Sequence, residues 1–512
     1  MAEFFLHGVE VVEIDNGPRP IRTVKSSVIG LIGTAPEADP SAFPINTPVL
    51  VTGSRREAAK LGSAGTLPWA IDGIFDQVGA MVVVVRVAEG ADEQETLANI
   101  LGGVDEPTGN YEGVHAFLAA RSIAKVTPRI LVAPGFTHQR PDASNDPVAL
   151  GPNKISVSFD GDDLVLTSSI ASAELIEGVF RDADGANVDV MSADTPADGG
   201  TGAKLTFAGI KDQLSEGDTF EFRYKGEVYT GTIDDISAAN TPTKLKNSIT
   251  GFIAAAIYTP SVTGKLANPV VAELLGIAER LRAVIIADGP NTNDADAISY
   301  REDWGSARVY VVDPHVKVMR DGVVTTEPAS ARVAGMIAKI DNDRGFWWSP
   351  SNNTLNGIIG THRPVDFQLG DPNARANYLN EKEVTTIIHE DGYRLWGNRT
   401  CSSDPKWAFL SVRRTADMIN ESLMQAHLWA VDRAITKTYV EDVQEGVNAY
   451  LRHLKAQGAI LGGRCWVDPD LNTPQSIAQG KIYFDFDFTA PYPAEHIIFR
   501  SHLVDDYIEE IF

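Results

Sequence analysis

Cysteine is nearly absent from this chain of 512 residues, which contains only Cys401 and Cys465. Two thiols cannot form a disulfide framework or a four-cysteine zinc site, and such low cysteine usage is typical of proteins that assemble in a reducing cytoplasm. We therefore expect two inert thiols.

Long apolar runs and basic charge are also scarce. The chain has no stretch of about 18 consecutive apolar residues, and Met1–Gly8 lacks the basic region followed by an apolar one that marks a signal peptide. Lysine and arginine number 44 against 69 aspartate and glutamate residues, a formal net charge of −25. Because phosphate binding requires a basic surface, we expect no direct contact with nucleic acid, no membrane insertion and no export by a signal peptide.

Sequence motifs that carry chemistry are missing as well. The chain has no Gly-x-Ser-x-Gly elbow and no His-Glu-x-x-His, and Gly199–Lys204 lacks the Gly-Lys-Ser/Thr ending of a phosphate loop. Asp468–Asn472 resembles the start of a calcium loop, but the later glycine and glutamate are missing, so a solvated turn is the better interpretation. The ten histidines are scattered singly. We therefore predict no enzyme activity, no cofactor and no metal site.

One aromatic pair allows a binding interpretation. Trp347 and Trp348 lie close to Arg344 in the sequence, and such a group could form a platform for a sugar or a nucleobase. Because the pair follows a helical pattern directly, we prefer core packing as its role.

Strand-like runs alternate with helical patterns through residues 23–150 and 261–375. This alternation predicts a doubly wound, largely parallel α/β core. The strand-like runs are rich in valine and isoleucine and lie at Ser27–Thr34, Pro48–Val51, Met81–Val87, Arg129–Ala133, Ala283–Ala287 and Val309–Val312. The helical patterns lie at Arg55–Leu61, Leu67–Gln77, 113–124, 269–282 and 295–303, and Asn268 with Pro269 supplies a cap and a first-turn proline.

Residues 151–260 interrupt this alternation. Their short alternating runs, separated by glycine and aspartate turns, predict only strands, and the segment has 17 acidic against 8 basic residues. We interpret it as an inserted β-rich outer domain whose ends lie close together, because insertions are tolerated at exposed loop tips. An elaborate loop of the main domain is the alternative.

Residues 376–495 have a third pattern, that of an α+β domain. Glu383–Ile388 and Tyr393–Trp396 predict a hairpin. Two amphipathic helices follow. Their apolar positions are Ile419, Leu423, Ala426 and Ala430 in the first and Val443, Val447, Tyr450, Leu451 and Leu454 in the second.

Both ends of the chain have the pattern of β-strands, although termini are usually disordered unless a partner holds them. Residues 1–22 contain a strand-like run that stops at Gly17–Pro20, and a clean alternation before Pro491 is followed by a second apolar run in residues 496–512. We predict strand arms whose apolar residues are Val9, Val11 and Ile14 at the first end and Ile482, Phe484, Phe486, Phe488, Ile497 and Phe499 at the other. Such arms need a partner strand, in the same chain or in another.

The last residues differ from the arm before them. Leu503–Phe512 is apolar to its final side chain but lacks a period of two. Leu503, Tyr507 and Ile511 would align on one face of a helix, so we expect this segment to pack differently.

Several separated blocks are specific enough to suggest a family. They are His7–Ile14, Gly17–Ile21, Val28–Pro36, Ser411–Thr415, Gln475–Lys481 and Pro493–Phe499. In their order they resemble the contractile-tail sheath proteins of myophages, with a subtilisin-like middle domain and a sheath C-terminal domain. The resemblance covers nearly the whole chain and leaves only about 151–260 unplaced.

The resemblance implies a structural subunit and not a protease. It implies six-subunit rings that stack helically around a tail tube, with terminal arms, here residues 1–22 and 496–512, donated to the sheets of neighbouring subunits. It also implies contraction on a signal from the baseplate, which drives the tube through a bacterial envelope during DNA ejection. The implied partners are further copies of the chain, the tail tube protein, the baseplate and the tail terminator, in a virion tail assembled in the host cytoplasm.

A sheath must hold its tube and then release it. In an acidic protein a basic cluster is the natural place for this contact, and from the C-terminal domain we select Arg413, Arg414, Arg433 and Lys437 as tube-contact candidates. Exposed ion pairs contribute about 0–1 kcal/mol each, so several per ring could hold firmly and still release together. The alternative is that these residues only balance neighbouring carboxylates.

Other functions stay open at this point. The sheath of a headless contractile particle, tailocin-like or part of a secretion apparatus, would have the same sequence features. A subtilisin-like or other α/β hydrolase would require a reactive nucleophile. A surface adhesin built on the acidic β domain is disfavoured by the missing secretion signal.

Overall fold

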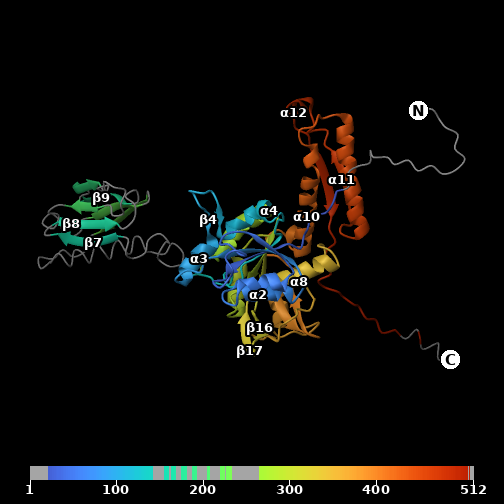
Figure 1. The fold of residues 1–512 in the computed structure, drawn as a ribbon, viewed down its shortest axis with the longest axis horizontal. Helices are drawn as coiled ribbons and strands as arrows, with labels where there is room; N and C mark the ends of the chain where they lie inside the picture. The colour runs from blue at the N-terminus through green and yellow to red at the C-terminus, as the bar shows by residue number, and fades with distance from the viewer. Residues whose placement is uncertain are drawn as a thin grey trace. The chain divides into compact units, whose positions relative to one another are not determined.

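The computed structural model describes residues 21–141, residues 265–504 and Tyr507, together with the backbone of seven strands between residues 155 and 232. The chain forms two compact units, and Figure 1 shows their elements. One unit consists of Met1–Gln139 with Ala267–Phe512, and the other of Arg140–Leu266. The protein is therefore a mixed α/β, multidomain chain.

The centre of the first unit is a six-stranded sheet with the order β15-β14-β6-β1-β3-β2. Five strands are parallel, and β2 joins one edge antiparallel to β3. The strands are β1 (Ile29–Thr34), β2 (Val49–Thr52), β3 (Met81–Val87), β6 (Ile130–Val132), β14 (Val284–Asp288) and β15 (Val309–Val312). Valine and isoleucine dominate because β-branched side chains fit a pleated surface that is covered on both faces. All six predicted runs of this kind form strands of this sheet.

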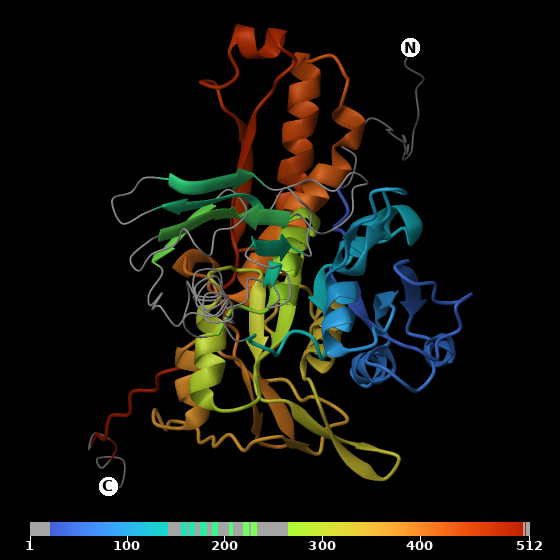
Figure 2. The ribbon, with the colours of Figure 1, turned by 90° about the vertical axis from the view of Figure 1, so that its left-hand side faces the viewer.

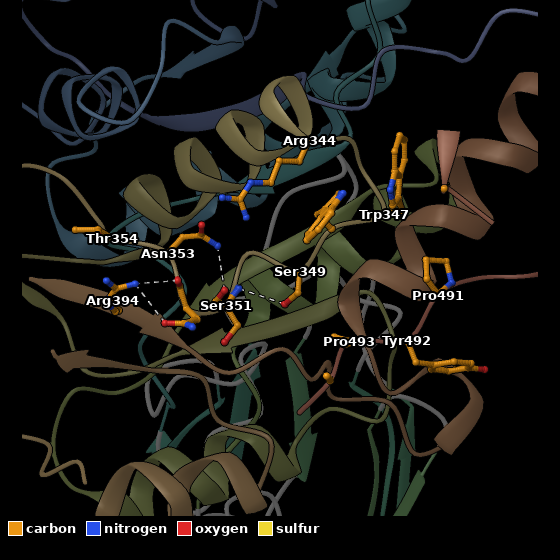
Figure 3. Close-up of a pocket in the computed structure, with 14 residues that line it drawn as sticks. Arg344, Trp347, Ser349, Ser351, Asn353, Thr354, Arg394, Pro491, Tyr492 and Pro493 are labelled. Atoms are coloured by element: carbon orange, nitrogen blue, oxygen red, sulfur yellow. Dashed lines mark hydrogen bonds between the residues drawn. The ribbon is translucent and has the colours of Figure 1, made fainter. Parts of the chain in front are cut away.

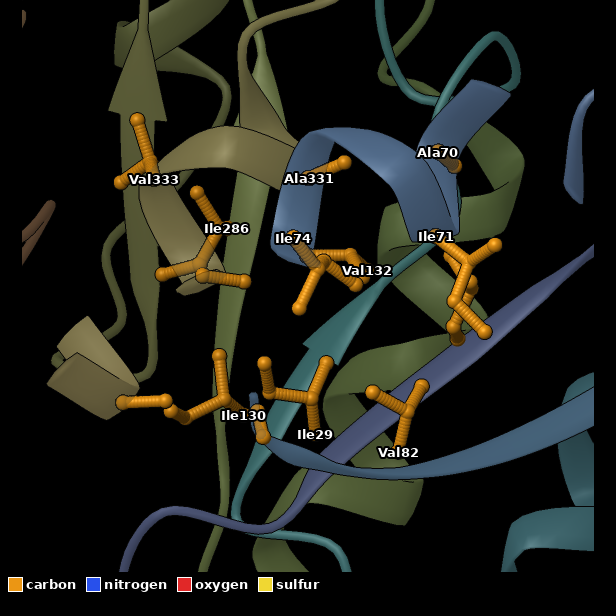
Figure 4. Close-up of a cluster of buried hydrophobic side chains, with 14 of the residues drawn as sticks. Ile29, Ala70, Ile71, Ile74, Val82, Ile130, Val132, Ile286, Ala331 and Val333 are labelled. Carbon is orange, nitrogen blue, oxygen red and sulfur yellow. The ribbon is translucent and has the colours of Figure 1, made fainter. Parts of the chain in front are cut away.

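Helices cover both faces of this sheet, and alternate residues of each strand enter two separate cores. Figure 4 shows one core, in which Val82 lies with Ile29 under α2 (Leu67–Phe75) and α8 (Ser330–Asp343). Val83 faces the opposite core. That core is covered by α3 (Glu93–Leu101), α6 (Pro269–Leu281) and α7 (Asp294–Glu302). Burial of each such aliphatic side chain contributes roughly 1.5–3 kcal/mol, so the two cores hold the unit together.

Two predicted helices are shorter and tighter than expected. The pattern at Arg55–Leu61 is α1 (Arg55–Ala58) followed by the 3₁₀ helix η1 (Ala59–Leu61). The pattern at 113–124 is the 3₁₀ helix η2 (Gly113–Ala119) followed by α4 (Ala120–Ile123). Short 3₁₀ segments are common in connections, where apolar spacing alone does not distinguish them from α-helix.

Asn268 ties together the chain segments on either side of the second unit. Its side chain caps α6 as predicted, because Oδ1 accepts a hydrogen bond from the Val271 N–H at 3.0 Å. Its Nδ2 donates to the carbonyls of Phe136 at 2.9 Å and Gln139 at 2.8 Å. The residue is only 1% exposed, so these three bonds are shielded from water.

We expect Asn268→Ala to lower the free energy of unfolding by about 2–4 kcal/mol. A lost N-cap costs roughly 0.5–2 kcal/mol, and carbonyls left without a donor add about 1–3 kcal/mol. Asn268→Ser keeps a capping oxygen but removes the amide, so it should lower the free energy of unfolding by less than Asn268→Ala does. Chemical denaturation measures both, with the exposed Asn110→Ala as a control expected to change stability by less than about 0.5 kcal/mol. Equal stability of wild type and Asn268→Ala would contradict this role.

The second unit is described by its strands alone. A four-stranded sheet has the order β10-β9-β12-β13, and a three-stranded sheet has the order β11-β8-β7. All pairings within them are antiparallel. The strands are β7 (Ile155–Asp160), β8 (Asp163–Ser168), β9 (Leu175–Arg181), β10 (Asn187–Ser192), β11 (Lys204–Phe207), β12 (Thr219–Tyr224) and β13 (Glu227–Thr232).

Small sheets follow the central one in the first unit. β16 (Val316–Arg320) pairs with β17 (Val323–Glu327) and with β18 (Gly360–Thr361). After α9 (Arg375–Glu381), β19 (Thr386–His389) and β20 (Tyr393–Trp396) form the hairpin that the sequence predicts.

Two long helices dominate the C-terminal part of the first unit. α10 (Leu410–Ala426) and α11 (Lys437–Gln457) lie side by side, and β21 (Gly462–Val467) and β22 (Phe484–Thr489) run along them (Figure 2). Six of the nine predicted apolar residues share one core with Phe346 and Cys465, namely Ile419, Leu423, Val447, Tyr450, Leu451 and Leu454. Ala430 lies beyond α10, in the 3₁₀ helix η5 (Leu428–Ala430). The short helix α12 (Pro474–Ala478) lies between the two strands in sequence. In the described ranges, no helix combines the length and the apolarity that crossing a membrane requires.

Candidate inter-subunit surfaces

The aromatic alternation near the C-terminus forms a strand within its own chain. β22 pairs antiparallel with β21. The rings of Phe484, Phe486 and Phe488 pack against the core of α10 and α11. The prediction that these three residues belong to a donated arm is therefore wrong, and Ile482 precedes the strand instead of lying in it. Period-two alternation identifies a strand with one buried face, but it does not tell which chain supplies the partner.

The outer edge of β21 is closed at its centre. The Cys465 N–H donates to Asn448 Oδ1 at 2.7 Å. Its carbonyl accepts from Asn448 Nδ2 at 3.1 Å and from Gln444 Nε2 at 3.3 Å. Side-chain amides of α11 thus take the place of a neighbouring strand, and both backbone groups of Cys465 point away from β22.

The outer edge of β22 is open. Cys465 lies opposite Phe486. In an antiparallel ladder, two opposite residues either both direct their backbone N–H and C=O groups toward each other or both direct them away. The N–H and C=O of Phe486 therefore point outward, and so do those of Phe484 and Phe488. No other strand in the described part of the chain pairs with this edge. An unpaired edge of this kind is a template for a strand from another chain.

The segment after β22 is anchored to its own body up to Glu495 and is exposed beyond it. Arg399 holds Glu495 through two hydrogen bonds of 2.8 and 2.6 Å, and Tyr492 packs edge-on against Phe409 with ring centroids 6.0 Å apart. Beyond Glu495, residues 496–504 form no hydrogen bond or ion pair with the described part of the chain. Ile497, Ile498 and Phe499 are 66%, 70% and 91% exposed, as a segment with no contact to its own body would be.

The N-terminal strand residues Val9, Val11 and Ile14 lie outside the described residues. From Ile21 onward the chain crosses the C-terminal helices before it enters β1. Ile21 and Val24 pack against the α10–α11 core, and the Val24 N–H donates to Ser422 Oγ at 3.0 Å.

Two of the four tube-contact candidates are paired with carboxylates of their own chain. Arg414 is 3% exposed and forms hydrogen bonds of 2.7 and 2.5 Å with Asp341. Its selection as a surface contact is therefore wrong, because a buried guanidinium cannot reach a partner's surface. Arg413 bonds to Asp417 at 2.8 and 3.2 Å and lies over the Trp407 ring at 4.2 Å. For these two residues the internal charge balance that the sequence left open is the observed arrangement.

The other two candidates lie at the surface, near an apolar group that the sequence analysis missed. Lys437 has 89% of its side chain exposed and is 3.7 Å from Glu441, and the exposed Arg433 lies 5.1 Å from the Trp429 ring centroid. In the last turn of α10 and in the segment that follows it, large apolar side chains face solvent at Met424, Leu428 and Val431, which are 54%, 74% and 62% exposed. We call Met424, Leu428, Val431, Arg433 and Lys437 the α10–α11 knob. Helical spacing could not reveal it because the segment between the helices has no period.

A buried ion cluster joins α10 to the central sheet. Arg129 lies 3.0 Å from Glu421, with side chains 2% and 6% exposed, and Arg308 holds Asp417 through bonds of 3.0 and 3.3 Å. Burial by itself would raise the pKa of Glu421, but hydrogen bonds from Gln425 and Arg129 and the Arg129 charge hold it below its ordinary value. Glu421 is therefore ionised and paired with Arg129, and together with the Arg308–Asp417 pair it fixes α10 against the core.

The carboxyl end of the central sheet contains an aspartate, histidines and a serine, the residue types of a hydrolase. Asp288 accepts the Ser330 N–H at 2.8 Å and the Ser330 hydroxyl at 2.5 Å. Burial raises the pKa of Asp288. His138 and His315 face each other edge-on with ring centroids 5.3 Å apart. The serine hydroxyl donates to a carboxylate and not to an imidazole, so these contacts hold the start of α8 and do not form the serine–histidine pair of a hydrolase.

His315 makes the core sensitive to acid. Burial, with a smaller effect of the His362 charge, lowers the pKa of His315 to about 4. Because this value lies below the ordinary 6.5, the unfolded chain takes up the proton first and stability is lost as pH falls from about 6.5 to about 4. We expect wild type to lose about 2 kcal/mol between pH 7 and 5 from this residue and His315→Gln to lose correspondingly less. Chemical denaturation at both pH values tests this, with the exposed His502→Gln as a control that should behave as wild type.

The remaining polar candidates have structural roles. Burial raises the pKa of Cys401 to about 12 and that of Cys465 to about 11, as expected of inert thiols. Asp468 Oδ1 accepts the Asp470 N–H at 2.7 Å, so the calcium-like stretch is a turn. In the ranges that the structure describes, no three His, Cys, Asp or Glu residues are grouped to hold a metal ion.

The tryptophan pair divides between core and surface. Trp347 packs against Phe346 with ring centroids 5.0 Å apart and joins the α10–α11 core, as predicted. Trp348 is 49% exposed, with the Arg344 guanidinium 5.5 Å from its ring centroid. Both line a cavity of about 600 Å³, which Figure 3 shows between the end of α8, β20 and the segment after β22.

Solved structures define the class of fold. The helical sheath of the anti-feeding prophage in its contracted state superimposes with a TM-score of 0.55 at 19% identity, covering 98% of this chain and 100% of that one. The sheath complex of an extracellular contractile injection system in its contracted state gives a TM-score of 0.52 at 15% identity, covering 99% and 100%. The fold is therefore that of contractile sheath subunits.

Sequence relatives identify the family. Family models match for the phage tail sheath C-terminal domain at residues 402–503, the phage tail sheath protein central domain at 239–401, and the tail sheath protein Gp18 domain III N-terminal region at 26–87. A prophage major tail sheath protein of Pseudomonas aeruginosa strain UCBPP-PA14 is 34% identical, covering 99% of this chain and 98% of its own. The tail sheath protein of Burkholderia phage BcepMu is 31% identical, covering 99% and 98%. The chain belongs to the phage tail sheath protein family, as the resemblance predicts.

Proposed function

We propose that this chain is the repeating subunit of a contractile tail sheath and that copies form six-subunit rings stacked around a tail tube. One observation carries the proposal. Within the residues that the structure describes, the same chain has an open strand edge on β22 and an exposed apolar segment, residues 496–504, without a hydrogen bond or ion pair to its own body. A donor on one surface and an acceptor on another make a head-to-tail contact, which builds rings and helical filaments.

The C-terminal arm has the length and composition for this contact. Residues 496–512 extend up to about 55 Å at about 3.3 Å per residue, enough to reach a neighbouring subunit. Pairing with β22 adds main-chain hydrogen bonds, and burial of Ile497, Ile498 and Phe499 adds roughly 1.5–3 kcal/mol each. Residues 1–20, which contain Val9, Val11 and Ile14, are proposed as a second donated arm.

Anchored arms would keep subunits joined while the sheath changes shape. The Arg399–Glu495 pair holds the start of the C-terminal arm, so a neighbour remains attached when the bodies rotate. Contraction then requires two packings of the same bodies, the final one more stable and separated from the first by a kinetic barrier. Such a sheath would drive its tube through a bacterial envelope during DNA ejection, on a signal from the baseplate.

The further parts of the proposal follow the family. The central sheet would be a non-catalytic domain of subtilisin-like topology within residues 23–150 and 261–375. Residues 151–260 would form an insertion on the outside of the sheath, residues 376–495 the sheath C-terminal domain, and residues 1–22 and 496–512 the arms. The tail terminator would close the polymer, and assembly would take place in the host cytoplasm.

A second candidate is the sheath of a headless contractile particle. The fold matches to the anti-feeding prophage and to an extracellular contractile injection system favour it, whereas the sheath proteins of intact phages favour a virion tail. Head genes beside the coding sequence would decide for the virion.

We place the tube contact at the α10–α11 knob, where Arg433 and Lys437 flank exposed apolar side chains. Charge reversal, Arg433→Glu with Lys437→Glu, should reduce co-sedimentation of the tube protein with sheath roughly tenfold, because several weak pairs per ring are lost together. Arg56→Glu, an exposed change on α1, is the control. Unchanged tube binding by the reversed variant would place the contact elsewhere.

Electron microscopy of the purified full chain tests the proposed function. We expect tubes or stacked rings with six-fold symmetry when the chain is concentrated. A particle that stays monomeric at high concentration would overturn the proposal.

A further inference from the structure

We infer that the cavity beside Trp348 is a docking site for residues 503–512 of a second copy of this chain. The inference rests on the proposed function, since it adds a second contact to the donated C-terminal arm. It assigns a role to the cavity and to the last residues of the chain, which do not fit the alternating pattern of a strand.

The cavity combines aromatic surface with positive charge. Its volume is about 600 Å³, and Trp348 and Tyr492, which are 49% and 58% exposed, both line it. Arg344 and Arg394 line it as well (Figure 3). Exposed aromatic side chains beside arginine are enriched where proteins bind one another, because they lose little conformational entropy on binding.

Neither arginine is neutralised by the described part of the chain. Arg394 donates to the Glu390 carbonyl at 2.7 Å and to the carbonyl and side chain of Asn352 at 3.2 and 3.3 Å, all of them uncharged acceptors. Arg344 lies over the Trp348 ring. In the described ranges neither forms an ion pair with a carboxylate, although the whole chain has a net charge of −25. The cavity therefore suits an acidic and aromatic ligand.

The last residues of the chain have that chemistry. Leu503–Phe512 contains Asp505, Asp506, Glu509 and Glu510, and it also contains Tyr507 and Phe512. The other proposed arm, residues 1–20, has two aromatic residues, Phe4 and Phe5, and four acidic residues spread over thirteen positions, whereas Asp505–Glu510 places four carboxylates around Tyr507 within six residues. Carboxylates can pair with arginine while rings stack against tryptophan and tyrosine, so the C-terminal segment fits the cavity better.

The position of the cavity continues the proposed arm contact. Gly458, just before β21, and Pro491, just after β22, both line it, so it lies where β22 ends. An arm that runs parallel to β22 along its outer edge leaves the sheet at that end. Residues 503–512 would then enter the cavity of the same acceptor subunit. The inference thus requires a parallel arrangement of arm and β22.

Cysteine cross-linking of the assembled full chain tests the contact. Thr354→Cys at the cavity combined with Ile508→Cys should give a ladder of linked chains on a denaturing gel after mild oxidation. Arg56→Cys with Ile508→Cys, and the parent chain with its two buried cysteines, should give none. A link within one chain, or a link from Thr354→Cys to Val12→Cys in place of Ile508→Cys, would overturn the inference.

Charge exchange tests the chemistry. Arg344→Glu should raise the concentration needed for polymer formation roughly three- to tenfold. Glu509→Lys with Glu510→Lys in the same chain should restore it, whereas Arg56→Glu should have no effect. If Arg344→Glu weakens assembly and the two lysine substitutions do not restore it, the inference is overturned, because Arg344 then does not contact this segment.

Two deletions separate this inference from the proposed function. Removing residues 503–512 should leave polymers that need a several-fold higher concentration, and removing 496–512 should abolish them. If the first deletion polymerises as wild type does and the second does not, arm donation stands and the docking site is wrong. If the wild-type chain forms no polymer, the proposed function fails, and this inference fails with it.

Discussion

Removal of residues 496–512 is expected to leave a folded monomer that forms neither rings nor tubes. Residues 496–504 form no hydrogen bond with the described part of their own body, so loss of the segment should not destabilise the fold. Its three central apolar side chains, Ile497, Ile498 and Phe499, are mostly exposed in the isolated subunit and have nothing else to cover them. Assembly should therefore be lost while stability is kept.

The measurement combines two readouts on one sample. Sedimentation velocity or electron microscopy should show monomers at concentrations where wild type forms polymers, and thermal unfolding should occur within about 2 °C of wild type. A matched variant keeps the chain length and changes only polarity, with Ile497→Ser, Ile498→Ser and Phe499→Ser. It should assemble as poorly as the deletion because burial of these side chains drives the contact. Full-length tubes from either variant would show that this end does not interlace.

Deletion of residues 1–20 is the companion experiment for the other end. The described chain from Ile21 onward already packs against α10 and α11, so the body should again remain folded. If only one deletion blocks assembly, a single arm carries the joint.

The central fold was predictable from the sequence because its signals are local. β1 and β3 consist mostly of valine, isoleucine, leucine and glycine, and a strand buried on both faces needs little more than that. The cap at Asn268 was predictable for the same reason, since a cap and its helix are neighbours in sequence.

The interaction surfaces were less predictable because they depend on distant partners. β22 was recognised as a strand, but its partner β21 begins with two glycines and an arginine, so only its last residues favour a strand. Arg414 was placed at the surface from its charge alone, whereas Asp341 neutralises it from a different helix. Neither pairing leaves a trace in the sequence near the residue concerned.

Removal of one partner of the buried pair Arg308–Asp417 is expected to lower the free energy of unfolding by several kcal/mol. The side chains are 6% and 1% exposed, and Arg308 also donates to the Ala283 carbonyl at 3.0 Å. Asp417→Leu leaves Arg308 with the largely exposed Glu279 as its remaining carboxylate, and Arg308→Met leaves Asp417 with Arg413. Each single change should lower the free energy of unfolding by about 3–5 kcal/mol, because a buried charge loses a partner.

The double variant distinguishes this cause from simple loss of contacts. Arg308→Met with Asp417→Leu removes both charges and should cost clearly less than the sum of the single changes, since no charge of the pair is left uncompensated. The exposed pair of Lys437 and Glu441, also measured as two alanine singles and a double, should couple by less than about 0.5 kcal/mol. Chemical denaturation of monomeric protein provides all values. Additive costs at Arg308 and Asp417 would mean that α10 is held to the central sheet by packing alone and not by the ion cluster.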